Sequence, residues 1–246
     1  NQRKFPGERD PSSDEHRRDT HGHGVMLAAA RFVVVMNVIH RFGEQDGLLY
    51  MAMQYIDGAD LAAVIESFAK DGDYIEVAEV IRLTHEMGAA LDYAHSKGVI
   101  HRDIKPHNVM IDQNNHVFIT DFGLALMTEI GTHGMVFGSP HYIAPEQAIS
   151  SAGVVPQSDL YAMAVIVYEM LTNTVPFDAD APLDIAMMHM TQDVPSPRAP
   201  RADLSEEVEQ VMLKALAKEP EDRYSTGEDF ATALEQALAD KPKKPS

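Results

Sequence analysis

The chain has 246 residues, 45% of them apolar, which is enough to bury the core of one large domain or of a small lobe joined to a larger one. Its formal net charge of −18 argues against binding to nucleic acid or to an anionic membrane surface, because the electrostatic field of the molecule repels both. The chain has no cysteine, which excludes disulfides, thiolate metal sites and cysteine nucleophiles.

The first 56 residues predict a small β-rich region. Residues 1–24 are polar and rich in charge, and they carry no apolar period that predicts an element. Two β-prone runs follow at 33–43 and 48–56, and Asp46-Gly47 between them is a strong hairpin signal. These runs predict a small antiparallel sheet.

From residue 57 the pattern becomes helical. The helix at 158–173 is apolar on nearly every face and should be the central, fully surrounded one. Thr226 and Asp229 have the spacing of a capping box at the start of the last helix. Five helices are predicted in all, at 60–70, 76–98, 158–173, 205–220 and 226–240.

A dense group of polar residues lies between the second and third of these helices. The stretch HRDIKPHN at 101–108 precedes two β-prone segments, which can pair through a turn at Asn114-Asn115. A turn centred there places Asn108 opposite Asp121, with their Cβ atoms about 5 Å apart. An amide oxygen beside a carboxylate suits Mg²⁺, which takes one or two protein oxygens and leaves its other positions to water and phosphate.

Asp103 and Lys105 are expected at the same edge. A carboxylate with no metal to hold can accept a proton from a hydroxyl nucleophile, while a lysine offsets the charge of a transferring phosphoryl group. This arrangement predicts phosphoryl-transfer chemistry.

Three motifs occur in order: HRDIKPHN, Asp121-Phe122-Gly123 and Ala144-Pro145-Glu146. They resemble the catalytic loop, the metal loop and the closing motif of protein kinases. The resemblance runs from about residue 48 to residue 238 and is closest to the bacterial, eukaryotic-like (Hanks-type) serine/threonine kinases. It implies an α+β, bilobal protein kinase fold with a reduced N-lobe at 1–56, a helical C-lobe at 57–240 that carries the catalytic and activation segments, and a tail at 241–246.

The resemblance also implies roles for single residues. Asp103 is the expected catalytic base, Lys105 contacts the γ-phosphate of ATP, and Asn108 and Asp121 hold Mg²⁺ or Mn²⁺. The adenine of ATP is expected against the segment that joins the lobes, with the nucleotide-binding residues Met53, Gln54, Ile56 and Met110.

Further residues are implied in the activation and substrate segment. Arg102 implies a cationic pocket for a phosphate on the activation loop, with Thr128 and Thr132 as the candidate phosphorylation sites. Ser139 is expected to bond toward Asp103 and Lys105. Glu146 and Arg223 are expected to form a buried ion pair that anchors the substrate-binding segment, and Asp159 should tie the central helix to the catalytic loop.

The N-terminal part departs from the family pattern. The chain has no G-x-G-x-x-G motif, and its only lysine before residue 70 is Lys4. Truncation, a corrupted reading frame and true loss of the N-lobe would all give this sequence. The alternative function is therefore a pseudokinase or nucleotide-binding scaffold that lacks turnover, whereas a small-molecule phosphotransferase is disfavoured by the peptide-docking segment at 138–146.

The expected activity is that of an ATP-dependent serine/threonine protein kinase in bacterial signalling. Its expected partners are protein substrates and a second copy of the chain for autophosphorylation, with no nucleic acid and no membrane segment in this chain. The longest apolar run, at 25–39, contains Arg31 and is too short to span a bilayer. Nothing directs secretion, so the expected location is the cytoplasm, or the intracellular side of a longer, membrane-anchored protein.

Overall fold

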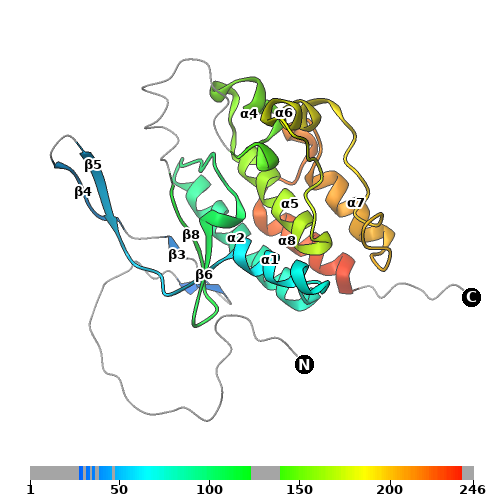
Figure 1. The fold of residues 1–246 in the computed structure, drawn as a ribbon, viewed down its shortest axis with the longest axis horizontal. Coiled ribbons are helices and arrows are strands. Elements are labelled where there is room, and N and C mark those ends of the chain that lie inside the picture. The colour runs from blue at the N-terminus through cyan, green and yellow to red at the C-terminus, as the bar shows by residue number, and fades with distance from the viewer. Residues whose placement is uncertain are drawn as a thin grey trace, which may run out of the picture.

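The structure is a computed structural model that describes residues 28–29, 32–33, 35–36, 39–45, 48–122 and 139–239. These residues form a small β-rich part and a larger, mainly helical part (Figure 1). The strands are β1 (Ala28–Ala29), β2 (Phe32–Val33), β3 (Val35–Met36), β4 (Ile39–Gln45), β5 (Leu48–Met53), β6 (Gly58–Asp60), β7 (Val109–Asp112) and β8 (Val117–Ile119). The helices are α1 (Leu61–Asp71), α2 (Val77–Ser96), α4 (Pro145–Ile149), α5 (Pro156–Thr172), α6 (Pro182–Thr191), α7 (Glu206–Ala215) and α8 (Gly227–Ala239), with short 3₁₀ turns η1 (Pro106–Asn108), η2 (Pro140–Tyr142), η3 (Ser151–Gly153) and η4 (Pro220–Asp222).

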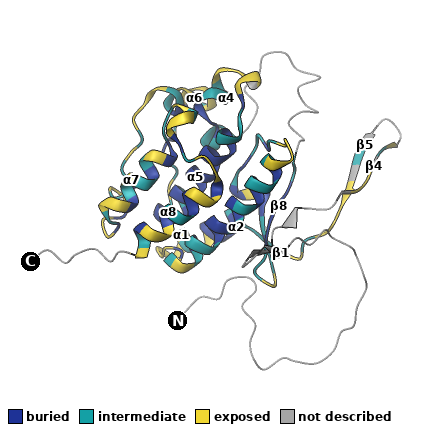
Figure 2. Ribbon diagram, turned by 180° about the vertical axis from the view of Figure 1, so that it is seen from behind, coloured by how far each residue is buried: buried dark blue, intermediate teal, exposed yellow. Residues whose placement is uncertain are grey.

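Helix α5 is the centre of the helical part, as its sequence predicts. Fourteen of its seventeen residues are buried, and Figure 2 shows it in dark blue among the other helices. It packs against α2 and α7, and α2 packs in turn against α8. An apolar surface all round a helix is stable only when protein covers every side. The neighbouring helices therefore pack around α5 as the core of this part.

Local signals set the ends of the predicted helices. The Asp60 carboxylate accepts a hydrogen bond of 2.8 Å from the backbone N–H of Ala63 and caps α1. Gly98, just after α2, has a φ of 73° and donates its N–H to the carbonyl of His95 over 2.9 Å. Ser205 caps α7 by accepting from the N–H of Val208 over 3.2 Å. All five predicted helices are confirmed, although α7 ends at Ala215, well before Pro220.

The predicted hairpin near Asp46-Gly47 is also confirmed. Strands β4 and β5 are antiparallel, and Gln45 pairs with Leu48, so the loop between them is two residues long. In Figure 1 this hairpin projects away from the helical part. The beginning of the first β-prone run behaves differently, because β3 pairs in parallel with β8 instead of joining the hairpin.

The sheet that carries the polar loop has four strands in the order β3-β8-β7-β6. The pairs β6–β7 and β7–β8 are antiparallel, whereas β3 is parallel to β8. Residues 54–57 connect β5 to β6, so this short segment links the projecting hairpin to the sheet. Within the described residues, no helix is both long and apolar enough to cross a bilayer.

Candidate active site

The β7–β8 hairpin has a different register from the predicted one. Val109 pairs with Ile119 and Ile111 with Val117, so the strand pairing shifts by one residue from a turn centred on Asn114-Asn115. Asn108 therefore lies opposite Thr120, whose N–H donates to the Asn108 carbonyl over 2.8 Å. The predicted pairing of Asn108 with Asp121 is wrong by one residue. Asp121 follows Thr120 directly, so the side chains of Asn108 and Asp121 still both belong to the open end of the hairpin.

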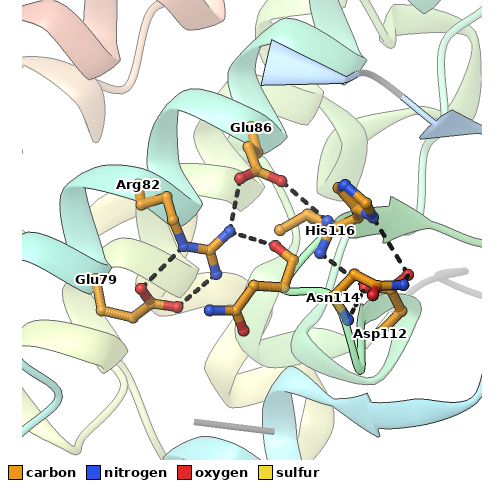
Figure 3. Close-up of polar contacts among 8 residues, drawn as sticks. Glu79, Arg82, Glu86, Asp112, Asn114 and His116 are labelled. Carbon is orange, nitrogen blue, oxygen red and sulfur yellow. Dashed lines mark hydrogen bonds and ion pairs between the residues drawn. The ribbon is translucent and has the colours of Figure 1, made fainter. Parts of the chain in front are cut away.

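The Asp112 side chain explains the three-residue loop at 113–115. Its carboxylate accepts hydrogen bonds of 2.8 Å from the backbone N–H groups of both Asn114 and His116 (Figure 3). Asn115 takes the left-handed conformation, with a φ of 66°. Burial raises the pKa of Asp112, but the hydrogen bonds from His116 and Asn114 outweigh it and hold that pKa below its usual range. The carboxylate is thus charged at neutral pH and closes the turn.

Helix α2 holds the same turn from outside. Arg82 donates to the carbonyl oxygen of Asn115 over 2.6 Å, and its guanidinium also pairs with Glu79 and Glu86. The second oxygen of Glu86 accepts from the N–H of Val117 over 2.9 Å, at the start of β8 (Figure 3). Arg82 and Glu86 on α2 thereby fix the closed end of the hairpin.

The Asp103 carboxylate is held at both oxygens. Lys105 donates to one oxygen over 2.7 Å, and the amide of Asn108 reaches the same oxygen at 3.3 Å. The backbone N–H of Ser139 lies 3.4 Å from the other oxygen. The contact of Ser139 with Asp103 is therefore made by its backbone N–H. Asp103 remains 28% exposed, so its carboxylate is accessible from solvent.

Asn108 and Asp121 have the donor chemistry that a magnesium ion prefers. The Nδ2 atom of Asn108 donates to the Asp103 carbonyl over 2.8 Å, which turns its Oδ1 away from that loop. Asp121 has a φ of 64°, a left-handed conformation that few non-glycine residues adopt. Within residues 28–122 and 139–239, as far as they are described, no cluster of three or more acidic, histidine or cysteine side chains could hold an ion. An ion at Asn108 and Asp121 would need further oxygens from a ligand or water, which is the usual behaviour of Mg²⁺.

His101 joins the loop of Asp103 to the end of β8. It is fully buried, donates its Nε2–H to the carbonyl of Thr120 over 2.7 Å and accepts the N–H of Asp103 at Nδ1 over 3.2 Å. Its ring also packs edge-on against Phe122 at 4.5 Å between centroids. The position is therefore structural, because both ring nitrogens serve to link backbone segments.

Asp159 on α5 organises the residues just before Asp103. One of its oxygens accepts the N–H of Arg102 over 2.8 Å, and the other accepts the N–H of His101 over 2.8 Å. His95 at the end of α2 contacts that second oxygen at 2.8 Å. The carboxylate is 1% exposed, and these partners offset the loss of its hydration.

Glu146 and Arg223 lie in direct, bidentate contact. The two terminal nitrogens of Arg223 lie 2.8 Å from the two oxygens of Glu146, and Ser158 donates to the same carboxylate over 2.6 Å. Burial raises the pKa of Glu146, but hydrogen bonds from Arg223 and Ser158 and the Arg223 charge bring it below its usual range. The segment at 139–149 is thus tied to the helical part by a charged pair.

A second polar link to this segment has no signal in the sequence. His189 on α6 is fully buried, lies 2.8 Å from the Tyr161 hydroxyl at Nδ1, and lies 3.0 Å from the His141 carbonyl at Nε2. Because a carbonyl can only accept, Nε2 carries the proton and the Tyr161 hydroxyl donates to Nδ1. Burial lowers the pKa of His189 to about 4, so the ring is neutral and this tautomer is fixed. The link can be seen only in the structure, because its three residues belong to three different elements, α5, α6 and η2.

Two of the residues predicted to bind adenine, Gln54 and Ile56, lie in the segment joining β5 to β6. An open cavity of about 200 Å³ is lined by Gln54, Tyr55, Ile56, Asp57, Asp112, Gln113, Asn114 and Phe118. Met110 pairs with Phe118 across the hairpin, so both side chains belong to the same face of the sheet. Met53 ends β5 and is 37% exposed.

The predicted phosphorylation sites Thr128 and Thr132, together with Gly123, lie outside the described residues.

Comparisons with known proteins agree with this geometry. The sequence profile described as protein kinase domain matches residues 15–239. The serine/threonine-protein kinase PrkC of Bacillus subtilis is 35% identical over 203 residues, which cover 81% of this chain and 31% of PrkC. The probable serine/threonine-protein kinase PknB of Lactococcus lactis is 37% identical over 193 residues, covering 77% of this chain and 30% of PknB. The crystal structure of the PknI kinase domain of Mycobacterium tuberculosis aligns with a TM-score of 0.63 and 30% identity, covering 81% of this chain and 69% of that one.

The chain spans about a third of the length of these curated relatives. The match to the family profile includes the whole of the polar loop, the β7–β8 hairpin and the Glu146–Arg223 pair. The chain therefore belongs to the protein kinase domain family, among the bacterial, Hanks-type serine/threonine kinases.

Proposed function

We propose that this chain transfers the γ-phosphate of ATP to serine or threonine hydroxyls of proteins. The observation that carries the proposal is the Asp103 carboxylate, 2.7 Å from Lys105 and 3.3 Å from the Asn108 amide, at the open end of the hairpin that leads to Asp121. A base, a cation and two hard oxygen donors in one place are the parts that phosphoryl transfer requires.

Each residue has one task in this scheme. Asp103 accepts the proton of the attacking hydroxyl, and Lys105 moves toward the transferring phosphoryl group and offsets its negative charge. Asn108 and Asp121 would hold Mg²⁺ or Mn²⁺, which neutralises phosphate charge when bound. The adenine would lie against residues 54–56, where Gln54 and Ile56 offer backbone groups and Met53 and Met110 apolar contacts.

The substrate protein would lie along residues 139–146. The Glu146–Arg223 pair and the contact of His189 with the His141 carbonyl fix this segment to the helical part. This attachment supports a fixed surface for an extended peptide. After a second copy of the chain has phosphorylated Thr128 or Thr132, Arg102 would bind the phosphate group carried by that threonine. We place this reaction in the cytoplasm, where ATP is present.

A scaffold that binds nucleotide without turnover is the second candidate. The sequence feature that favours it is the lack of a G-x-G-x-x-G motif and of a lysine between residues 5 and 69. Without these groups the α- and β-phosphates lose contacts that position them for reaction.

One experiment separates the two functions. The purified chain is incubated with Mg²⁺, ATP and a generic protein substrate, beside Asp103→Asn and the exposed control Asp73→Asn. We expect transfer by the wild type and the control, and a loss of about 10² to 10⁴-fold in Asp103→Asn, because the base is removed. Nucleotide binding with no transfer above the Asp103→Asn level would establish the scaffold instead.

A further inference from the structure

Arg102, the residue before the base, has an unfavourable backbone conformation. Its φ is 72°, in the left-handed region that few residues other than glycine adopt. Such a conformation persists only when neighbouring groups hold the peptide on either side of the residue. The contacts of the Arg102 backbone therefore bear directly on the orientation of Asp103.

The two polar groups of the Arg102 backbone are held by different parts of the protein. Its N–H donates over 2.8 Å to Asp159 on the central helix α5. Its carbonyl accepts from the side-chain Nε2 of Gln147 over 2.6 Å. Gln147 belongs to α4, in the segment that we expect to bind the substrate, and it follows Glu146 directly.

We propose that Gln147 is a positioning residue, which makes the geometry of the base depend on correct docking of the substrate-binding segment. The inference rests on the proposed function for its catalytic readout. The Glu146–Arg223 pair docks α4 on the helical part, and the adjacent Gln147 then holds the carbonyl that immediately precedes Asp103. The second anchor of the same segment on Asp103, the N–H of Ser139, is long at 3.4 Å. Of these two contacts between the segment and residues 102–103, the hydrogen bond from Gln147 is the shorter.

The surroundings decide which variant tests the proposal. A cavity of about 10 Å³, room for about one water molecule, adjoins Gln147 and is also lined by Arg102, Asp103 and Asp159. Truncation to alanine would enlarge this space, and water could then donate to the Arg102 carbonyl in place of the amide. Gln147→Glu keeps the size of the side chain but places a carboxylate, which can only accept, against a carbonyl oxygen.

Gln147→Glu also supplies an internal rescue by pH. When the carboxylate introduced at position 147 is protonated, it regains one donor and can bond the Arg102 carbonyl again. We expect kcat of Gln147→Glu to be at least ten-fold below wild type at pH 8, with the KM for ATP changed less than two-fold. The ratio of the two kcat values should then rise toward one as the pH falls to 5.5. Gln236→Glu, the same substitution at an exposed position of α8, should keep the wild-type kcat at each pH.

Amide hydrogen exchange gives a readout that does not need activity. In Gln147→Glu we expect peptides containing residues 101–103 to exchange at least ten-fold faster than in wild type at pH 8, while peptides from α5 remain unchanged. Wild-type kcat together with wild-type exchange in Gln147→Glu would overturn the inference and leave the proposed function intact. A kcat deficit that stays constant with pH would also overturn it, because a merely structural defect is not rescued by protonation. If the wild type shows no transfer, the proposed function fails, and the exchange of residues 101–103 alone decides whether Gln147 holds the loop.

Discussion

Arg223 lies with its two terminal nitrogens 2.8 Å from the two oxygens of Glu146, 77 residues earlier in the chain. The arginine side chain is 1% exposed, and its donors also reach the carbonyls of Ala217, Lys218 and Gln157. Each of its three nitrogens therefore contacts at least one fixed acceptor. A planar guanidinium can serve so many acceptors at once, whereas an ammonium group cannot.

Replacing Arg223 by lysine should therefore destabilise the protein although the charge is kept. We expect the free energy of unfolding to fall by about 3 kcal/mol, because Glu146 loses its bidentate partner in a buried place and several carbonyls lose their donor. Urea unfolding measures the change. Arg198→Lys is the matched control, since Arg198 pairs with Glu206 and Glu209 at the surface, and it should leave stability unchanged. Equal effects of the two substitutions would contradict the prediction.

The neutral, buried His189 predicts a loss of stability in mild acid. Burial lowers its pKa to about 4 in the folded protein, below the value of about 6.5 in the unfolded chain. The unfolded state thus binds more protons between these two values, so stability is full above pH 6.5 and falls as the pH drops below it. The contribution of His189 should amount to about 2 kcal/mol between pH 7 and pH 5.

The variant His189→Gln isolates this contribution, because glutamine can bond Tyr161 and the His141 carbonyl but does not titrate. We expect a shallower decline of unfolding free energy from pH 7 to pH 5 in the variant than in wild type, measured by urea unfolding at each pH. The pH range ends at 5 because the pKa of Glu146 lies below its usual range, so its contribution is lost only at lower pH. Parallel pH curves for the two proteins would show that His189 is not the titrating group.

How far the sequence predicts this site depends on the kind of information each residue carries. The starts of α1 and α7 and the end of α2 were predictable because Asp60, Ser205 and Gly98 act on their own neighbours in the chain, whereas α7 ends five residues before its predicted end. The β7–β8 hairpin was predictable as a hairpin, but its register was not. That register follows from Asp112, whose carboxylate bonds two backbone N–H groups and selects a three-residue loop over a two-residue one. A turn assigned from Asn114-Asn115 alone shifts every pair by one residue.

Residues that act through space were not predictable from local pattern. Gln147 and His189 bond carbonyls 45 and 48 residues away, and nothing near either residue in sequence indicates those partners. The Glu146–Arg223 pair is even more distant in the chain, but it was expected because the family resemblance supplied it. The hairpin of β4 and β5 was clear from Asp46-Gly47, whereas the pairing of β3 with β8 joins segments about 80 residues apart and has no local signal.

The close approach of α2 and α8 predicts that Gly88 tolerates no larger residue. A Cβ atom on Gly88 would lie 2.8 Å from the backbone carbon and oxygen of Gly227, closer than real Cβ atoms come to backbone. Gly88→Ala should lower the free energy of unfolding by about 1 to 3 kcal/mol, even though alanine favours helices, because the two helices must separate. Urea unfolding measures it, with Gly153→Ala as a control that meets only an ordinary contact at 3.4 Å. Stabilisation by Gly88→Ala would show that the helices can move apart freely.

The link between α2 and the β7–β8 turn predicts a large effect of removing Arg82. Its side chain is 22% exposed, and Glu79 and Glu86 beside it are 14% and 10% exposed. Methionine keeps much of the length of Arg82 but leaves two partly buried carboxylates facing each other and the Asn115 carbonyl without its donor (Figure 3). We expect Arg82→Met to lower the free energy of unfolding by about 2 to 3 kcal/mol. The amides of residues 113–117 should also exchange faster, because Glu86 then loses the partner that holds it against the N–H of Val117.

Lys70→Met, which removes the exposed pair with Glu66 on α1, is the control for Arg82→Met. It should change neither the free energy of unfolding nor the exchange, since surface ion pairs contribute little. Wild-type stability in Arg82→Met would mean that Asp112 closes the turn without help from α2.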